Sequence, residues 1–137
     1  RILPGVTEVV EAAHTSPDHS QGLLTGNLRA AAEAKLVPFG LWDYFSFGAF
    51  ADDAIERLDL GPIALARASV YCDATFVREA VTVIGDSPHA IACARAIGAR
   101  SLAVASGRFT MDQLAECEPT FLVSSLEEPA VLSFLSL

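Results

Sequence analysis

The first residues of this chain that could do chemistry form a short turn after an apolar segment. Thr25, Gly26 and Asn27 come directly after residues 22–24, and Lys35, the only lysine in the chain, lies in the segment that follows. A hydroxyl and free N–H groups at the start of a helix can hold a phosphate. A lysine adds positive charge where charge develops on phosphoryl oxygens. These residues are candidates for a phosphate-binding site, with Thr25 and Lys35 as its candidate catalytic residues. The alternative is an ordinary turn with a helix cap, followed by a solvated lysine.

The second group is a carboxylate at the end of the apolar run 81–84. Gly85 breaks this run, Asp86 follows it, and Ser87 and Pro88 open the next segment. In an open α/β sheet, ligands bind at the carboxyl ends of the strands. An aspartate there can hold Mg²⁺, which typically takes one or two carboxylates together with phosphate and water. Asp86 is therefore the candidate metal ligand.

The order of the apolar segments predicts the elements that position these groups. Helix-like and strand-like segments alternate, which indicates an α/β fold with a mostly parallel sheet. No repeat or flexible linker interrupts this alternation, so residues 1–137 are expected to form a single domain. The expected strands are residues 22–24, 45–50, 81–84, 101–105 and 121–123.

The helix boundaries are marked by residues with strong positional preferences. Asn27 is expected to cap the helix after the first turn, Pro62 to open a later helix, and Gly98 to end the helix 88–97. Two patterns, Thr110-x-x-Gln113 and Ser125-x-x-Glu128, predict capping boxes for two further helices.

The composition excludes several classes of function. The net charge of −8 argues against nucleic acid as a partner, because phosphate backbones need a basic surface. The same charge repels anions, so a phosphate site would have to rely on local groups. No apolar run approaches the length of a membrane span. We therefore expect a protein of the cytoplasm, without a membrane partner.

The remaining polar candidates are weaker. Three widely spaced cysteines, Cys72, Cys93 and Cys117, suggest neither a disulfide framework nor a zinc site and are expected to be reduced and buried. Arg57 follows two aspartates, with which it would form a surface ion pair, or it would reach an anion. No glycine-rich dinucleotide motif and no phosphate-binding loop of the Walker type occurs.

The ordered set of motifs resembles the haloacid dehalogenase (HAD) superfamily, in particular its phosphoglycolate-phosphatase-like members. Residues 23–28 are similar to the second motif of the family, Lys35 and Leu36 to the third, and residues 83–88 to the fourth. The resemblance implies a three-layer Rossmann-like core and a phosphatase that uses Mg²⁺ and acts on a small phosphorylated metabolite. Thr25 would bind the phosphate, Lys35 would stabilise the phosphoryl intermediate, and Asp86 would bind the metal.

The chain departs from the family in two respects. The family's nucleophile is the first aspartate of an Asp-x-Asp motif, which forms an aspartyl-phosphate, and no Asp-x-Asp occurs in this sequence. The chain is therefore expected to start after the family's first strand and cap, as a partial core. Second, the fourth motif ends in Ala90 where its relatives carry a second aspartate. His89 could bind a softer metal, but a solvated helix position is the favoured interpretation.

The expected absence of the first strand has a structural consequence, since that strand is central in the family's sheet. Either the strand from Gly22 pairs directly with the strand from Val81, or another chain or an upstream segment fills the gap.

Three functional hypotheses follow. The first is a fragment of a HAD-like phosphatase core that is inactive alone, because the nucleophile is absent and a metal carboxylate is replaced by Ala90. The second is a degenerate HAD-like binding or interaction module. The third is a flavodoxin-like or receiver-type domain. Domains of that type lack this order of threonine, lysine and Gly-Asp.

Overall fold

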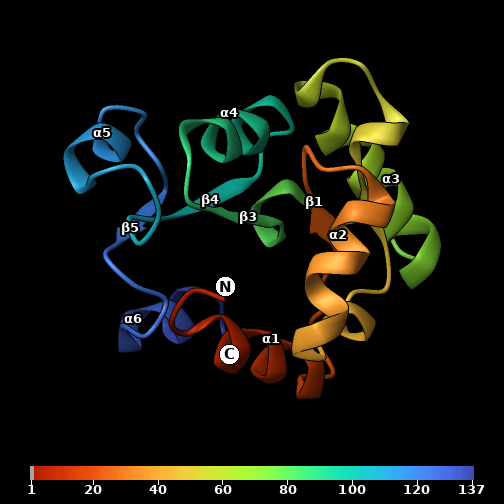
Figure 1. The fold of residues 1–137 in the computed structure, drawn as a ribbon, viewed down its shortest axis with the longest axis horizontal. Coiled ribbons are helices and arrows are strands. Elements are labelled where there is room, and N and C mark those ends of the chain that lie inside the picture. Colours follow the sequence, from red (N-terminus) through yellow and green to blue (C-terminus); the bar gives the residue numbers. More distant parts are fainter. Residues whose placement is uncertain (1) are drawn as a thin grey trace. The chain divides into compact units, whose positions relative to one another are not determined.

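The computed structural model describes residues 2–137, which divide into two compact units. The three-strand unit consists of residues 2–9 and 76–137, and the two-strand unit consists of residues 10–75. Both units combine helices with parallel strands (Figure 1). The α/β fold class is therefore confirmed, and the small size of the two sheets fits an incomplete core. The expectation of a single domain over residues 1–137 stays a prediction.

The three-strand unit is built on the parallel sheet β3-β4-β5. Its strands are β3 (Thr82–Gly85), β4 (Arg100–Val104) and β5 (Phe121–Val123). Gly85 pairs in register with Ala103, and Val104 pairs with Val123. All three strands therefore end at the same edge of the sheet, which places the residues after β3 beside those after β4.

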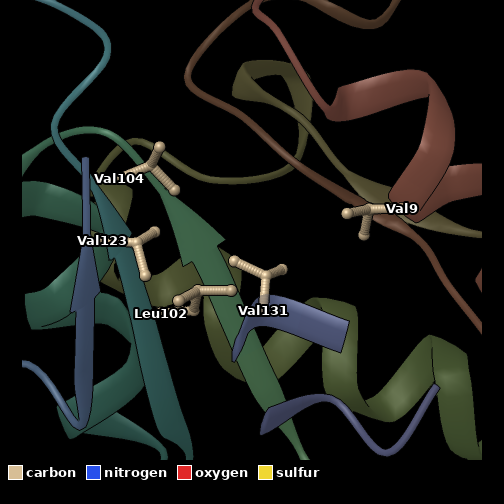
Figure 2. Close-up of a cluster of buried hydrophobic side chains, with 5 residues drawn as sticks. All are labelled: Val9, Leu102, Val104, Val123 and Val131. Atoms are coloured by element: carbon tan, nitrogen blue, oxygen red, sulfur yellow. The ribbon is translucent and has the colours of Figure 1, made fainter. Parts of the chain in front are cut away.

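Successive residues of β4 pack on opposite faces of this sheet. Leu102 and Val104 join Val123, with Val9 of α1 (Val6–Thr15) and Val131 of α6 (Pro129–Phe134), in one buried cluster (Figure 2). Ala103 packs instead against α4 (Pro88–Ala96) and α5 (Met111–Ala115). This alternation follows from the two-residue period of a strand. It gives the unit the three layers that the sequence predicts.

Hydrogen bonds at the helix ends fix the adjoining loops of this unit. Gly98 has a φ of 71° and donates to the carbonyl of Arg95, while Ala99 donates to Ala94, which together form a Schellman motif. Thr110 and Gln113 form the predicted capping box. The capping box predicted at Ser125 is wrong: the Glu128 carboxylate accepts from Ser124 and Ser125 in a turn, and α6 begins afterwards.

The two-strand unit is built on the parallel pair β1 (Leu23–Leu24) and β2 (Gly48–Ala49). Its helices are α2 (Arg29–Leu36) and α3 (Leu60–Cys72), and α3 packs on both strands. Short turns of 3-10 helix lie between these elements and in the other unit. They are η1 (Val37–Phe39), η2 (Trp42–Tyr44), η3 (Ala51–Asp53) and η4 (Arg57–Asp59) in this unit, and η5 (Arg78–Ala80) in the other.

Several predicted boundaries shift in the structure. The strand expected at residues 45–50 is reduced to Gly48–Ala49, because Trp42–Tyr44 forms a helical turn that Phe45 closes. The helix expected to open at Pro62 already begins at Leu60. In the part of the chain that the structure describes, β1 pairs only with β2, and β3 only with β4. Direct pairing of the strands from Gly22 and Val81 is therefore not observed, whereas a strand supplied from elsewhere stays a prediction.

The cysteines also differ from expectation. All three are free, but only Cys93 is buried, while Cys72 and Cys117 are partly exposed. Cys72 lies near the end of α3, where its thiol donates to the Ser20 hydroxyl at 3.2 Å. Within residues 2–137, no helix combines the length and the hydropathy needed to cross a bilayer.

Candidate functional site

The turn after β1 is held by its own side chains. The Thr25 hydroxyl oxygen accepts hydrogen bonds from both the backbone N–H and the side-chain amide of Asn27, each at 3.1 Å. The backbone of Thr25 donates to Ala49 of β2, and Ala51 donates to the carbonyl of Asn27 at 2.9 Å. The turn is thus fixed between the ends of two parallel strands, where ligand sites are expected in α/β sheets.

The predicted lysine lies at this turn. The Lys35 ammonium donates to the side-chain oxygen of Asn27 at 3.3 Å, from the last turn of α2. The structure therefore brings together Thr25, Gly26, Asn27 and Lys35, all four residues of the predicted phosphate site. Lys35 is exposed, so its ammonium can turn toward a ligand at little cost.

The cap of α2 differs from the prediction. Asn27 was expected to cap this helix, but its side chain binds Thr25 and Lys35, and the N-cap residue is Leu28. Asp52 performs the capping instead, because its carboxylate accepts from the backbone N–H of Arg29 at 2.7 Å. A carboxylate at a helix N-terminus is favourable for the helix dipole. Asp52 lies 23 residues from Arg29 in the sequence, so a local sequence pattern could not predict this cap.

A cavity of about 460 Å³ opens beside Gly26. Its lining consists of Gly26, Ala51, Asp52, Asp53, Ala54, Ile55, Arg57 and Leu60. The Arg57 guanidinium lies directly against Gly26: a Cβ atom at position 26 would come within 2.8 Å of Nε. A side chain at position 26 would therefore displace the Arg57 guanidinium from this position. The two interpretations of Arg57, a surface ion pair and a contact with an anion, stay predictions.

The aspartates of the cavity wall are engaged differently. Asp53 forms a bidentate ion pair with Arg67 of α3, at 2.7 and 2.8 Å. The hydrogen bonds from Arg67, and then the one from the Phe50 backbone, lower the pKa of Asp53 to about 2. Its negative charge is thus balanced by Arg67. Asp52 directs one oxygen at the start of α2.

The candidate metal ligand, Asp86, belongs to the three-strand unit and follows β3. A Cβ atom on Gly107, in the loop after β4, would come within 2.4 Å of an Asp86 carboxylate oxygen. Glycine at position 107 therefore gives that carboxylate its room. Ala90, in the first turn of α4, lies against Gly85, whose own Cβ would meet that of Ala90 at 2.3 Å.

Two buried polar atoms flank this loop region. The Nε2 atom of His89 and the hydroxyl of Ser106 are both buried without a hydrogen-bond partner. The preferred interpretation of His89 as a solvated helix residue is therefore wrong for that nitrogen. Nothing in the local sequence indicated the burial, because it depends on packing around α4.

The residues near Asp86 do not by themselves complete a Mg²⁺ site. Among residues 2–137, no group of three or more histidine, cysteine, aspartate or glutamate side chains lies in a metal-binding arrangement. Mg²⁺ prefers oxygen ligands in an octahedron, and Asp86 offers one carboxylate. Position 90, where the sequence comparison with the family expects a second carboxylate, carries the methyl group of Ala90.

Comparisons with known proteins identify the family of the chain. Residues 49–129 match the model of the HAD-hydrolase-like family, and this match covers more than half of the chain. The chain therefore belongs to the HAD-hydrolase-like family. The resemblance drawn from its motifs is confirmed.

A curated relative is the Dickeya dadantii (strain 3937) protein named "Probable phosphatase IndB". It is 28% identical over 130 residues, which cover 93% of this chain and 54% of that protein. The chain thus spans about half the length of this relative.

Two solved structures share the fold. A predicted phosphoglycolate phosphatase from Haemophilus somnus superposes with a TM-score of 0.78 at 17% identity, over 97% of this chain and 57% of that chain. The HAD-type protein YfnB of Bacillus subtilis, solved with bound magnesium, gives a TM-score of 0.77 at 16% identity, over 100% and 57% of the two chains.

Proposed function

We propose that this chain carries the phosphate-holding part of a HAD-type phosphatase and recognises the phosphate of a small phosphorylated metabolite. The observation that carries the proposal is the turn at Thr25, where the Asn27 side chain links the Thr25 hydroxyl to the Lys35 ammonium, and where Gly26 borders a cavity. Family membership supports it, and the name of the Dickeya relative agrees with it.

The chemistry of the turn suits a phosphate. The Thr25 oxygen already accepts two hydrogen bonds, so its own proton is the group that can be donated to a phosphate oxygen. Lys35 and Arg57 would supply positive charge from α2 and from η4. Charge-assisted hydrogen bonds of this kind are the strong ones. In a chain with a net charge of −8, such local cations are needed to offset the repulsion of an anion.

The metal chemistry is proposed only in outline. Mg²⁺, when bound in a phosphatase, neutralises charge on the phosphate oxygens. Asp86 would contribute one carboxylate to such an ion, and we propose that binding is weak because position 90 carries alanine. The magnesium in the Bacillus structure supports the choice of cation. No step of a reaction is assigned to the ion in this chain.

The proposal includes the absence of turnover by the 137-residue chain alone. A HAD-type reaction needs an aspartate nucleophile in an Asp-x-Asp motif, and the sequence contains none. The alternative is a binding or interaction module that retains the fold without the chemistry. Ala90 favours this alternative, because it removes a metal carboxylate as well.

Thr25 provides the test of phosphate binding. Inorganic phosphate is titrated into ¹⁵N-labelled chain, and the amide signals of Gly26 and Asn27 are followed. The variant Thr25→Val, which loses the hydroxyl, is expected to bind phosphate roughly tenfold or more weakly, the cost of a hydrogen bond to a charged group. Thr25→Ser keeps the hydroxyl and is expected to retain most of the affinity.

Thr7→Val serves as the matched control, since Thr7 is an exposed threonine of α1. It is expected to bind phosphate as the unmodified chain does. A titration in which the unmodified chain shows no change at Gly26 and Asn27, or in which Thr25→Val binds equally well, contradicts the proposal.

A further inference from the structure

One arginine ties together three elements around the cavity in the two-strand unit. Arg67 of α3 donates from both terminal nitrogens to Asp53, at 2.7 and 2.8 Å. One of these nitrogens also donates to the carbonyl of Gly48 in β2, at 2.8 Å. A single guanidinium therefore links α3, β2 and η3, and its planar fork fixes the orientation of the carboxylate.

The Asp53 carboxylate is held from a second side as well. Its Oδ2 atom accepts from the backbone N–H of Phe50 at 2.9 Å, which closes the turn of η3. Asp53 is only 20% exposed, while Arg67 is 45% exposed. With bonds from two donors, the carboxylate has little freedom, and η3 is fixed where it forms the wall of the cavity.

The same turn, η3, holds the candidate phosphate loop. Ala51 donates to the carbonyl of Asn27 at 2.9 Å, and Asp52 accepts from the N–H of Arg29 at 2.7 Å. These two bonds fix the end of the Thr25–Gly26–Asn27 loop and the start of α2. A contact path therefore runs from Arg67 through Asp53 and η3 to the loop, although Arg67 is not among the residues that line the cavity.

Stability need not be the only consequence of this arrangement. Exposed ion pairs contribute little to the free energy of unfolding, because solvent screens them and ordering two side chains costs entropy. Binding sites, in contrast, depend on groups whose orientation is locked by supporting hydrogen bonds. The Arg67–Asp53 pair has that supporting geometry next to the proposed phosphate site.

We propose that Arg67 is a positioning residue, which acts through Asp53 and η3 to hold the Thr25–Gly26–Asn27 loop ready for an anion. This inference rests on the proposed function. It assigns Arg67 no contact with the phosphate. Its effect is the pre-orientation of the loop N–H groups and of the Thr25 hydroxyl.

The test compares Arg67→Met, which keeps the aliphatic stem, with Arg95→Met. Arg95 is an exposed arginine of α4 whose guanidinium likewise donates to a backbone carbonyl, that of Cys117, at 2.7 Å. Both variants are titrated with inorganic phosphate under conditions where circular dichroism shows them fully folded. The amide signals of Phe50, Arg29 and Asn27 are recorded before and during the titration.

In Arg67→Met, the ligand-free signals of Phe50 and Asn27 are expected to move, and phosphate affinity is expected to fall roughly fivefold or more. Arg95→Met is expected to leave both unchanged. Equal phosphate affinity of Arg67→Met and the unmodified chain overturns the positioning role alone. An unmodified chain that binds no phosphate at the loop contradicts the proposed function, so the two failures are distinguishable.

Discussion

Single residues decide which parts of the HAD chemistry this chain can retain. Thr25 and Lys35 meet through Asn27 as the sequence predicts. In the fourth motif, Ala90 lies against Gly85. Its methyl group stands where the family's motif carries a second aspartate. The residues proposed to bind phosphate therefore lie together, while Asp86 is the one residue proposed to bind a metal.

Restoring the second carboxylate should strengthen cation binding. In Ala90→Asp, the new carboxylate would extend from the first turn of α4 beside Gly85 and Asp86. A second charged oxygen ligand is expected to tighten Mg²⁺ binding roughly tenfold or more, since affinity follows the number of charged ligands. Isothermal titration calorimetry with MgCl₂ measures this change.

Ala92→Asp, two residues further along α4, adds the same charge at a different angle around the helix. It is the control for a general effect of added negative charge. If Ala90→Asp binds Mg²⁺ no more tightly than Ala92→Asp, position 90 does not belong to a metal site.

Some features of the candidate site follow from local sequence patterns, whereas others depend on tertiary packing. Thr25 and Asp86 follow apolar runs directly, so local pattern was enough to locate them. The position of Arg57 against Gly26 could not be predicted, because it depends on the approach of η4 to this loop, which no spacing rule encodes. The burial of His89 Nε2 likewise arises from tertiary packing.

At the scale of elements, strand positions were predicted better than their lengths. The strand at Phe121–Val123 is where its apolar run indicates. The expected strand at residues 45–50 shrinks to Gly48–Ala49, since local turns at Trp42–Tyr44 and Ala51–Asp53 compete with it. The cap of α2, which the local pattern assigned to Asn27, is formed by a long-range hydrogen bond from the Arg29 N–H to Asp52.

The link between β2, η3 and α3 predicts a pH dependence of stability. The pKa of Asp53 is lowered from 3.8 to about 2, mainly by the hydrogen bonds from Arg67 and then by the hydrogen bond from the Phe50 backbone. A carboxyl group with a lowered pKa in the folded state stabilises the fold above its unfolded pKa and loses this contribution as it becomes protonated. Stability should therefore fall as the pH drops from about 4 to about 2.

The variant Asp53→Asn isolates this contribution, because it lacks the charge at every pH. Urea unfolding of both proteins between neutral and acidic pH is expected to show a difference that shrinks as the pH falls below about 4 and through about 2. Asp43→Asn, at an exposed aspartate of η2, is the control. A difference between Asp53→Asn and the unmodified chain that stays constant over this range contradicts the assignment.

At the scale of the whole molecule, family and fold are better defined than activity. The chain belongs to the HAD-hydrolase-like family and covers 54% of its Dickeya relative. The alternation of helices and strands was enough to predict the α/β class. Apolar residues recur with one period in strands and another in helices, and both periods can be recognised in a short stretch of sequence. The division into two units was not predicted, since it depends on contacts between distant segments.

The central claim is that this chain holds a phosphate at the Thr25 turn but cannot cleave a phosphomonoester alone. The most direct test adds p-nitrophenyl phosphate and MgCl₂ to the ¹⁵N-labelled 137-residue chain and records amide signals and released p-nitrophenolate together. We predict saturable shifts at Gly26 and Asn27, with no more p-nitrophenolate than a protein-free sample gives. Magnesium-dependent release of p-nitrophenolate, or the absence of any shift at Gly26 and Asn27, would contradict the claim.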